Sequence, residues 1–156
     1  MDDAGQDNAG VIVPPPLLYL GPLLAGLVLH RAAPAPLLPR SLARVLGAML
    51  IGGATALEVG FIRSMRRAHT PIDPRRPVTR LVTDGPFRIS RNPSYLALAA
   101  YYLGIASLLN TRWPVFLLPA VLLAVQRGVI QPEEQYLERK FGIPYRQYRT
   151  RVRRWL

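Results

Sequence analysis

The stretch "GPFRISRNPSYLALAAYYLG" (residues 85–104) sets a polar cluster directly in front of an apolar segment. Asn92 can cap a helix and Pro93 suits its first position, so the stretch predicts a helix that begins here. The apolar residues that follow are just numerous enough to cross the hydrocarbon of a bilayer. A helix start does not require Arg91 and Tyr95 as well, so these residues need a separate explanation.

Two explanations suit the extra polar residues. Arg88 and Arg91, beside a helix N-terminus, form a site suited to a carboxylate or phosphate group of a ligand. Tyr95 lies about one turn into the helix, where it can stack on a flat ligand or donate a hydrogen bond to it. The alternative is that the arginines bind lipid phosphates and that Tyr95 anchors the helix at the membrane interface.

Half of the 156 residues are hydrophobic, and they gather into blocks separated by charged stretches. A membrane-crossing helix needs about 20 mostly apolar residues. Four stretches come close, at residues 11–29, 42–62, 93–109 and 113–130. We therefore predict one domain over residues 1–156, an all-α polytopic membrane protein with about four transmembrane helices. Glycines in the second span would let a neighbouring helix approach closely; they are Gly47, Gly52, Gly53 and Gly60.

Basic residues predict the orientation. Residues 63–91 hold eight arginines, and residues 127–156 hold eight basic residues, whereas Arg31, Arg40, Arg44 and Arg112 belong to the other side. The positive-inside rule then places both termini, the 63–91 loop and the tail in the cytoplasm, as in an integral protein of a bacterial inner membrane. Any site that these two polar segments build is expected at the cytoplasmic boundary.

Composition excludes several classes of function. The chain has no cysteine and only two histidines, so a thiolate or imidazole metal centre is not expected. The net charge of +11 indicates anionic lipid headgroups as the partner rather than nucleic acid, because the apolar blocks are too long for a soluble fold. The acidic N-terminal decapeptide lacks a positive n-region, so no cleaved signal peptide is expected.

The C-terminal tail, "QPEEQYLERKFGIPYRQYRTRVRRWL", predicts two cytoplasmic helices, at 132–141 and 144–155. The second carries an apolar stripe typical of a helix lying on an anionic membrane surface; its members are Tyr145, Tyr148, Val152 and Trp155. Glu133 and Glu134 either favour a helix start or, with Arg88, Arg91 and Arg127, form a site for a zwitterionic ligand. Glu58, an ionisable residue near the cytoplasmic end of the second span, either has a function, faces the bundle interior, snorkels to the interface, or pairs with Arg63.

Two blocks resemble the isoprenylcysteine carboxyl methyltransferase and phospholipid methyltransferase family of integral membrane enzymes. "LVTDGPFRISRNPSYLALAAYYLG" is similar to a family pattern of Gly-Pro-Phe/Tyr-Arg followed by Arg-His-Pro-x-Tyr-x-Gly and a later glycine. "PEEQYLERKFGIPYRQYRTRV" is similar to a Glu-Glu, Leu, Phe-Gly, Tyr, Tyr pattern. The chain departs from the family in three places. Asn92 replaces histidine, Ala97 replaces the first glycine, and "VRRWL" replaces a Val-Pro-Arg ending.

The resemblance implies an all-helical membrane fold that binds S-adenosylmethionine near the cytosolic face and methylates a lipophilic or small acceptor arriving from the bilayer. By position, one wall of the cofactor site is expected from Gly85, Arg91, Asn92, Pro93, Tyr95 and Gly104. Glu133 and Glu134 are expected to close the site from the other side. Arg91 or Arg127 would hold the carboxylate of the cofactor, Glu134 its ammonium or ribose hydroxyls, and Tyr95 its adenine or sulfonium.

Asn92 and Glu134 are the residues expected to take part in catalysis. A carboxylate or thiolate acceptor needs no general base, whereas an amine or phenol must lose a proton. Asn92 cannot shuttle protons as histidine does near neutral pH. We therefore favour an acceptor that is already ionised, or one deprotonated by water or a glutamate. The alternatives are a nicotinamide-dependent membrane reductase of related architecture, although no Gly-rich dinucleotide fingerprint is visible, and a non-catalytic membrane scaffold. The identity of the acceptor and the oligomeric state stay open.

Overall fold

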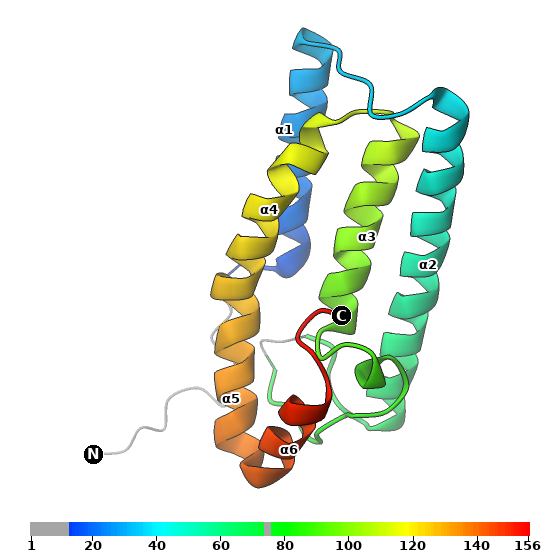
Figure 1. Ribbon diagram of the computed structural model, residues 1–156. Coiled ribbons are helices and arrows are strands. Elements are labelled where there is room, and N and C mark those ends of the chain that lie inside the picture. The colour runs from blue at the N-terminus through cyan, green and yellow to red at the C-terminus, as the bar shows by residue number, and fades with distance from the viewer. Residues whose placement is uncertain (1–12, 74–75) are drawn as a thin grey trace.

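The computed structural model describes residues 13–73 and 76–156, and their regular structure is entirely helical. Four long helices lie side by side, and shorter helices gather at one end of the bundle (Figure 1). The bounds are α1 Pro15–Ala32, α2 Arg40–Arg67, the 3-10 turn Gly85–Arg88, α3 Pro93–Leu108, α4 Trp113–Val125, a π-helical segment Gln126–Ile130, α5 Gln131–Phe141 and α6 Ile143–Arg151. The all-helical fold class is confirmed for these residues.

Prolines mark the starts of two long helices, and the start predicted at Pro93 is confirmed. The helix α1 begins at Pro15 and α3 at Pro93. Proline suits the first turn because its fixed φ is helical and its missing N–H would have no intrahelical partner there. The helix α2 runs from Arg40 to Arg67 and exceeds the predicted 42–62 at both ends. Its extra turns carry arginines that face away from the protein interior.

The predicted break after the fourth span is wrong. Residues 113–141 form one continuous helix, in which α4 passes through the π-helical segment into α5. Pro132 lacks an N–H, and in a regular α-helix its ring would crowd the carbonyl of Gly128. The wider π turn directly before it accommodates the proline without ending the helix. Glu133 and Glu134 consequently lie inside a helix rather than at its start.

Close packing of α2 against α3 depends on Gly47 and Gly104. A Cβ atom on Gly47 would lie 2.7 Å from a Leu108 side-chain atom and 2.9 Å from the Gly104 carbonyl. A Cβ on Gly104 would lie 2.7 Å from Ile51. The predicted close approach is therefore confirmed for Gly47. Within the described chain no helix approaches Gly52 or Gly53, because both are exposed and a Cβ there would have no neighbour within 4 Å.

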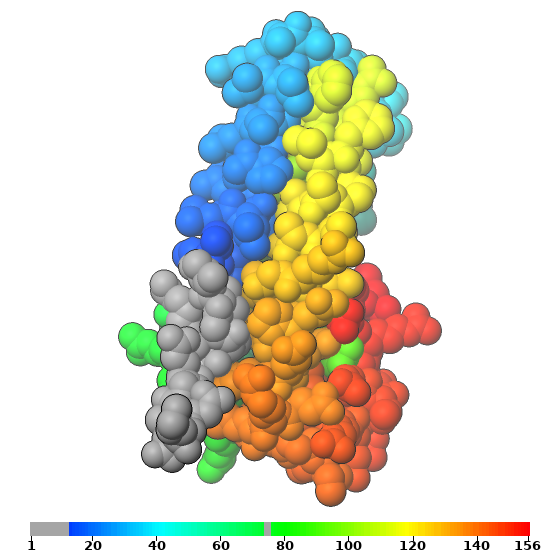
Figure 2. Space-filling model, turned by 90° about the vertical axis from the view of Figure 1, so that its left-hand side faces the viewer, coloured from blue at the N-terminus to red at the C-terminus, as the bar shows by residue number. Residues whose placement is uncertain are grey.

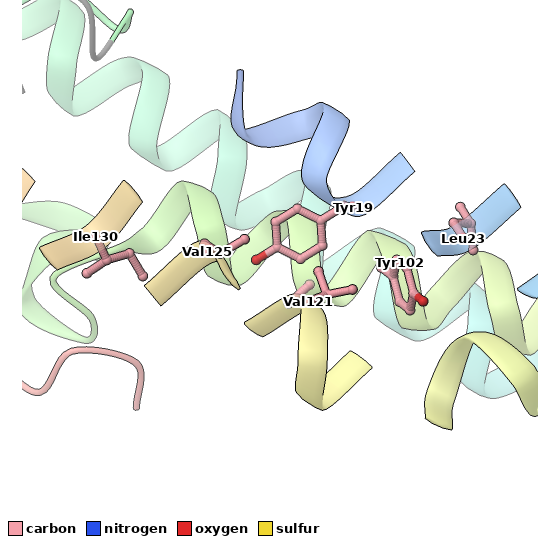
Figure 3. Packing of buried hydrophobic residues seen from close by; sticks show 7 residues of the cluster. Tyr19, Leu23, Tyr102, Val121, Val125 and Ile130 are labelled. Carbon is pink, nitrogen blue, oxygen red and sulfur yellow. The ribbon is translucent and has the colours of Figure 1, made fainter. Parts of the chain in front are cut away.

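The main hydrophobic core joins α1, α3 and the long fourth helix (Figure 3). Tyr19 and Leu23 of α1 pack with Tyr102 of α3 and with Val121 and Val125 of α4. The two tyrosine hydroxyls remain satisfied, because Tyr19 donates to the Tyr95 carbonyl at 3.1 Å and Tyr102 donates to the Pro114 carbonyl at 2.8 Å. This core fixes the start of α3 against α1 and the fourth helix.

Two helices, Arg40–Arg67 and Trp113–Phe141, are long and apolar enough to cross a membrane. Only 17% and 28% of their most apolar windows are buried inside the protein, so these windows present apolar side chains outward. Figure 2 shows α1 and α4 adjacent along one face. Both helices expose large apolar side chains, among them Leu24, Val28 and Phe116. This outward apolar surface is typical of a membrane protein. The four-span arrangement stays a prediction.

The predicted surface helix at 144–155 is only partly right. The helix α6 ends at Arg151, and Val152 is extended. Tyr145 and Tyr148 are buried, and Trp155 packs against the main core. The stripe thus covers the protein's own interior instead of facing lipid. Periodicity indicates an apolar face but does not say what covers that face.

Candidate functional site

A cavity of about 410 Å³ lies at the end of the bundle where α5 and α6 meet the start of α3. Its walls come from the start of α1, the second half of α2, residues 70–73 and 78–82, Phe87, the residues that lead into α3 and its first two turns, α5 and α6. Aliphatic and aromatic side chains predominate, and a few charged groups converge among them. This volume lies within the range of about 300–1,000 Å³ that is usual for small-molecule and cofactor sites.

Glu134 is the centre of a buried ion-pair cluster. Its Oε1 lies 3.1 Å from Nη2 of Arg91, and the two side chains are only 9% and 10% exposed. Arg154 binds the same carboxylate in a bidentate manner, with Nε at 3.0 Å from Oε1 and Nη2 at 2.7 Å from Oε2. The Glu134 carboxylate raises the pKa of the Arg154 guanidinium, chiefly through these hydrogen bonds. Two cations thus hold one carboxylate in place.

Arg91 has unused hydrogen-bonding capacity. Its Nε and Nη1 atoms are buried and have no hydrogen-bond partner. Buried donors without partners are rare and costly, at about 1–3 kcal/mol or more for a charged group. The residue lines the cavity, so these donors are available to a molecule placed there. Nη2, which binds Glu134, lies between these two groups on the guanidinium, so each of them would donate to a separate oxygen of a ligand.

Glu133, next in the chain to Glu134, has a different partner. The Tyr95 hydroxyl donates to its Oε1 at 2.6 Å. Tyr95 is itself held by its backbone, because its carbonyl accepts from Tyr19 of α1. In the part of the chain that the structure describes, no arginine or lysine pairs with Glu133. Both Glu133 and Tyr95 line the cavity, which therefore holds a carboxylate without a countercharge.

Glu58 reaches the same cavity from α2. Ser94, in the first turn of α3, donates a hydrogen bond to Glu58 Oε1 at 3.2 Å. The second oxygen, Oε2, is buried and has no partner. The predicted alternative of a pair with Arg63 does not occur, since the ion pairs among described residues do not include Glu58 and Arg63 is exposed.

The C-terminal residues close one side of the site. The Asn92 side chain donates from Nδ2 to the Arg154 carbonyl at 2.9 Å, and Ser90 Oγ donates to the same oxygen at 3.2 Å. The backbone N–H of Arg91 donates to the Arg153 carbonyl at 3.0 Å. Asn92 does occupy the position before α3, but its side chain makes no capping hydrogen bond. The expected capping role is therefore wrong, because the chain terminus takes the side chain instead.

Two tyrosines of α6 complete the wall beneath Arg91. Tyr145 and Tyr148 are buried and line the cavity. The Tyr148 hydroxyl donates to the Phe87 carbonyl at 2.7 Å and so ties α6 to the 3-10 turn before α3. Burial raises the pKa of Tyr145 to about 12, so its hydroxyl stays protonated at neutral pH. Both rings add apolar surface to the cavity that the charged cluster lines.

Six of the nine residues predicted for the cofactor site line this one cavity. They are Arg91, Asn92, Pro93, Tyr95, Glu133 and Glu134. The other three do not line it. Gly85 has a positive φ of 57° and lies where a Cβ would meet Ser64 Oγ at 2.5 Å; Gly104 packs against α2; and Arg127 is exposed on the π-helical segment.

Arg154 and Tyr145 are members of the site that sequence reasoning missed. Arg154 is one of many arginines near the C-terminus, and nothing in "VRRWL" distinguishes it from its neighbour Arg153. Only the extended path after Arg151 brings it to Glu134. Tyr145 was assigned to the apolar stripe of a surface helix. The family-like Tyr in "GIPYRQY" was the available signal that this face points inward.

Comparison with known proteins supports the resemblance that the two sequence blocks suggest. A family model described as phospholipid methyltransferase matches residues 42–143, which span α2 to the start of α6. An uncharacterized protein of Haemophilus influenzae (strain ATCC 51907 / DSM 11121 / KW20 / Rd) is 51% identical over 35 residues, which are 22% of this chain and 56% of that protein. The chain thus spans little more than half the length of that relative. No solved structure matches the chain.

Proposed function

Because the chain belongs to the phospholipid methyltransferase family, we propose that it transfers a methyl group from S-adenosylmethionine to a lipophilic or small acceptor at the cytoplasmic face of a membrane. The observation that carries the proposal is the pair of buried Arg91 donors without partners, which line one cavity with Glu133 and Tyr95. A cation with free donors beside an unpaired carboxylate suits the zwitterionic amino-acid part of the cofactor.

The residues present fit this cofactor. Nε or Nη1 of Arg91 would donate to the cofactor's carboxylate, and Glu133 would accept hydrogen bonds from its ammonium or its ribose hydroxyls. Glu134 already binds two arginines, so its proposed role is to position Arg91 rather than to contact the ligand. The Asn92 side chain is bound to the Arg154 carbonyl, so its proposed role is to hold the C-terminal residues over the site.

The cofactor supplies an electrophilic methyl group on a sulfonium, and the protein's task is alignment and exclusion of water. Arg91 and Glu133 would fix the amino-acid end at two points, and Tyr95 would pack beside the sulfonium. The buried rings of Tyr145 and Tyr148 would help to exclude water from the cavity. Alignment of two reactants in such a site is worth about 7–11 kcal/mol of the barrier.

The position of the cavity supports a membrane location for the reaction. Residues 63–91 and 127–156 each hold eight basic residues, and both segments contribute to the end of the bundle that contains the cavity. By the positive-inside rule this end would face the cytoplasm, where anionic headgroups would be the partner of its exposed arginines. The outward apolar faces of the long helices would admit a lipophilic acceptor from the bilayer.

Calorimetric titration with S-adenosylhomocysteine, the product form of the cofactor, tests the proposal. The purified full chain in detergent is expected to bind it, and Glu133→Gln is expected to weaken binding because the site loses the carboxylate proposed to hold the cofactor's ammonium or ribose hydroxyls. Glu138→Gln is the matched control, since Glu138 pairs with Arg146 and Arg149 on the surface; its affinity should equal that of the parent.

Two outcomes would overturn the proposal. Binding of a reduced nicotinamide dinucleotide instead of S-adenosylhomocysteine would favour the reductase, and binding of neither would favour the scaffold. A second readout uses S-adenosylmethionine with a tritiated methyl group and membranes that contain the protein. The methyltransferase is expected to move label into the lipid extract or into a small organic acceptor, whereas the two alternatives leave it in the cofactor.

A further inference from the structure

Glu58 is a cavity residue that the cofactor contacts above do not use. It lies about two and a half turns before the end of α2, within a helix that is long and apolar enough to cross a membrane. Ionisable residues at such positions are costly and usually serve a function. Its Oε1 accepts from Ser94, and its buried Oε2 accepts from nothing.

A purely structural explanation does not account for this carboxylate. A hydrogen bond from one serine satisfies only one oxygen, and a buried carboxylate oxygen without a partner destabilises the protein. The surrounding lining is mainly apolar, with Phe61, Met65 and Leu98. A glutamine or an apolar side chain would fill the same space at lower cost. The position therefore suggests that Oε2 has its partner in a bound molecule.

Glu58 and the proposed cofactor anchors belong to different walls of the cavity. Arg91 lies just before α3 and Glu133 lies in α5, whereas Glu58 comes from α2. The first turn of α3 connects the two walls, because Ser94 binds Glu58 and the adjacent Tyr95 binds Glu133. If the cofactor occupies the Arg91–Glu133 side, the remaining space beside Glu58 is open to the acceptor.

We propose that Glu58 Oε2 is the acceptor-side base, and that the acceptor is a protic nucleophile: an amine, a thiol or a phenol rather than a carboxylate. This inference rests on the proposed function. In the step, the acceptor's N, S or O atom forms a bond to the methyl carbon as the carbon–sulfur bond of the sulfonium breaks. The electron pair of the broken bond stays on the sulfur. The acceptor's proton passes to Oε2 of Glu58. A carboxylate acceptor has no such proton to give and would be repelled by Glu58.

The test uses acceptors that share one alkyl chain and differ in their heads. The full chain in detergent is given tritiated-methyl S-adenosylmethionine with dodecylamine, dodecanethiol, 4-dodecylphenol or dodecanoate. We expect methylation of one or more of the three protic heads and none of dodecanoate. Glu58→Gln is expected to lower that rate by about 10²–10⁴-fold, the usual contribution of a general base, and to leave the affinity for S-adenosylhomocysteine unchanged.

A further acceptor separates a base from a structural residue. 4-Dodecyl-2-nitrophenol ionises near neutral pH and needs no base. Glu58→Gln should therefore lose less methylation rate with this acceptor than with 4-dodecylphenol. If the protein methylates only the amine or the thiol, that acceptor takes the place of 4-dodecylphenol in the comparison. Glu58→Asp keeps a carboxylate and is expected to retain more activity than Glu58→Gln. Glu138→Gln serves again as the surface control, with rates equal to those of the parent.

The outcomes separate this inference from the function on which it rests. A parent protein that fails to bind S-adenosylhomocysteine contradicts the proposed function itself. A parent that binds it but methylates only dodecanoate, or no protic head, contradicts the assignment of the acceptor class. Equal rates for the parent and Glu58→Gln, or an equal loss with the ionised and the un-ionised acceptors, contradict the role of Glu58 as a base.

Discussion

The two ends of the helical bundle differ in how completely their polar groups are hydrogen-bonded. At the end that joins α1 to α2 and α3 to α4, Asn110 uses its side chain to bind the backbone of Leu37 and Leu38, and Trp113 donates to the Ala33 carbonyl. At the cavity end, charged groups are buried and only partly paired. Of the four buried side-chain atoms without a partner in the described chain, three belong to Glu58 and Arg91, and one to Thr111 at the other end.

This contrast indicates which end is built for stability and which for binding. The connecting loops between helices need their backbone groups satisfied, and side chains nearby supply the partners. Unsatisfied charged atoms, by contrast, persist where a ligand completes them or where their strain has a use. The comparison predicts that substitutions at the cavity end change ligand binding more than stability, and that substitutions in the helix interface do the reverse.

The largest effect is expected from Arg91→Ala. The substitution removes the proposed carboxylate anchor and leaves Glu134 with Arg154 alone. Truncation of one partner of a buried charge pair, here Arg91 and the carboxylate of the ligand, costs about 2–5 kcal/mol of binding free energy. The affinity for S-adenosylhomocysteine, measured by calorimetry, should therefore fall by roughly 30-fold or more.

Arg88→Ala is the matched control for this prediction. Arg88 lies in the same short segment but is exposed and does not line the cavity. Its removal should leave the affinity for S-adenosylhomocysteine as in the parent. If the two variants lose affinity equally, general attraction by the basic segment explains binding, and the contrast between buried and exposed arginines at this end has no functional meaning.

The sequence predicted the parts of this architecture that depend on local chemistry. Proline marks the starts of α1 and α3 because its backbone suits a first turn. The "RNPSY" and "EE" blocks could be assigned to one site because each adjoins an apolar span at the basic side. Arg91, Tyr95 and Glu134 indeed line one cavity.

What the sequence could not predict depends on longer-range packing. Pro132 looked like a helix start, yet the π-helical segment before it lets the helix continue. The apolar stripe that begins with Tyr145 and Tyr148 was predicted to face lipid. Periodicity shows that one side of a helix is apolar, but it does not show whether lipid or protein packs against that side. Arg154 reaches Glu134 only through the extended backbone after Arg151, and Asn92 binds that backbone instead of its own helix.

The second prediction concerns the interface of α2 and α3, where the largest effect should be on stability. Gly47→Ala places a methyl group 2.7 Å from Leu108 and 2.9 Å from the Gly104 carbonyl, so the two helices must separate. Overpacking of this kind typically costs about 1–3 kcal/mol. Thermal unfolding in detergent should show a lower melting temperature.

Gly52→Ala is the control on the same helix. A Cβ there meets nothing within 4 Å, and alanine is about 0.8–1.0 kcal/mol better than glycine in a helix interior. Its melting temperature should equal or exceed that of the parent. A loss in Gly52→Ala as large as that in Gly47→Ala would mean that the outward face of α2 is packed against another chain, and that the α2–α3 contact does not explain the glycines.

The smallest effect separates the buried arginine of the tail from a surface arginine nearby. Arg154→Ala removes two hydrogen bonds to Glu134 but keeps the carbonyl that Asn92 and Ser90 bind, so the tail stays attached and only the guanidinium is lost. Because this side chain is 32% exposed, solvent screening limits the loss to about 1 kcal/mol of the free energy of unfolding.

Arg149→Ala is the surface control for Arg154→Ala and is expected to cost the least stability. Arg149 is 45% exposed and contacts Glu138, which Arg146 also binds, so the carboxylate keeps a partner. Exposed pairs contribute about 0–1 kcal/mol, and with that second partner present the melting temperature should hardly move. Arg154→Ala should also weaken the binding of S-adenosylhomocysteine, since Glu134 positions Arg91, whereas Arg149→Ala should not. If both variants leave ligand affinity unchanged, Arg91 is held in place without the tail, and the C-terminal residues then serve only to cover the cavity.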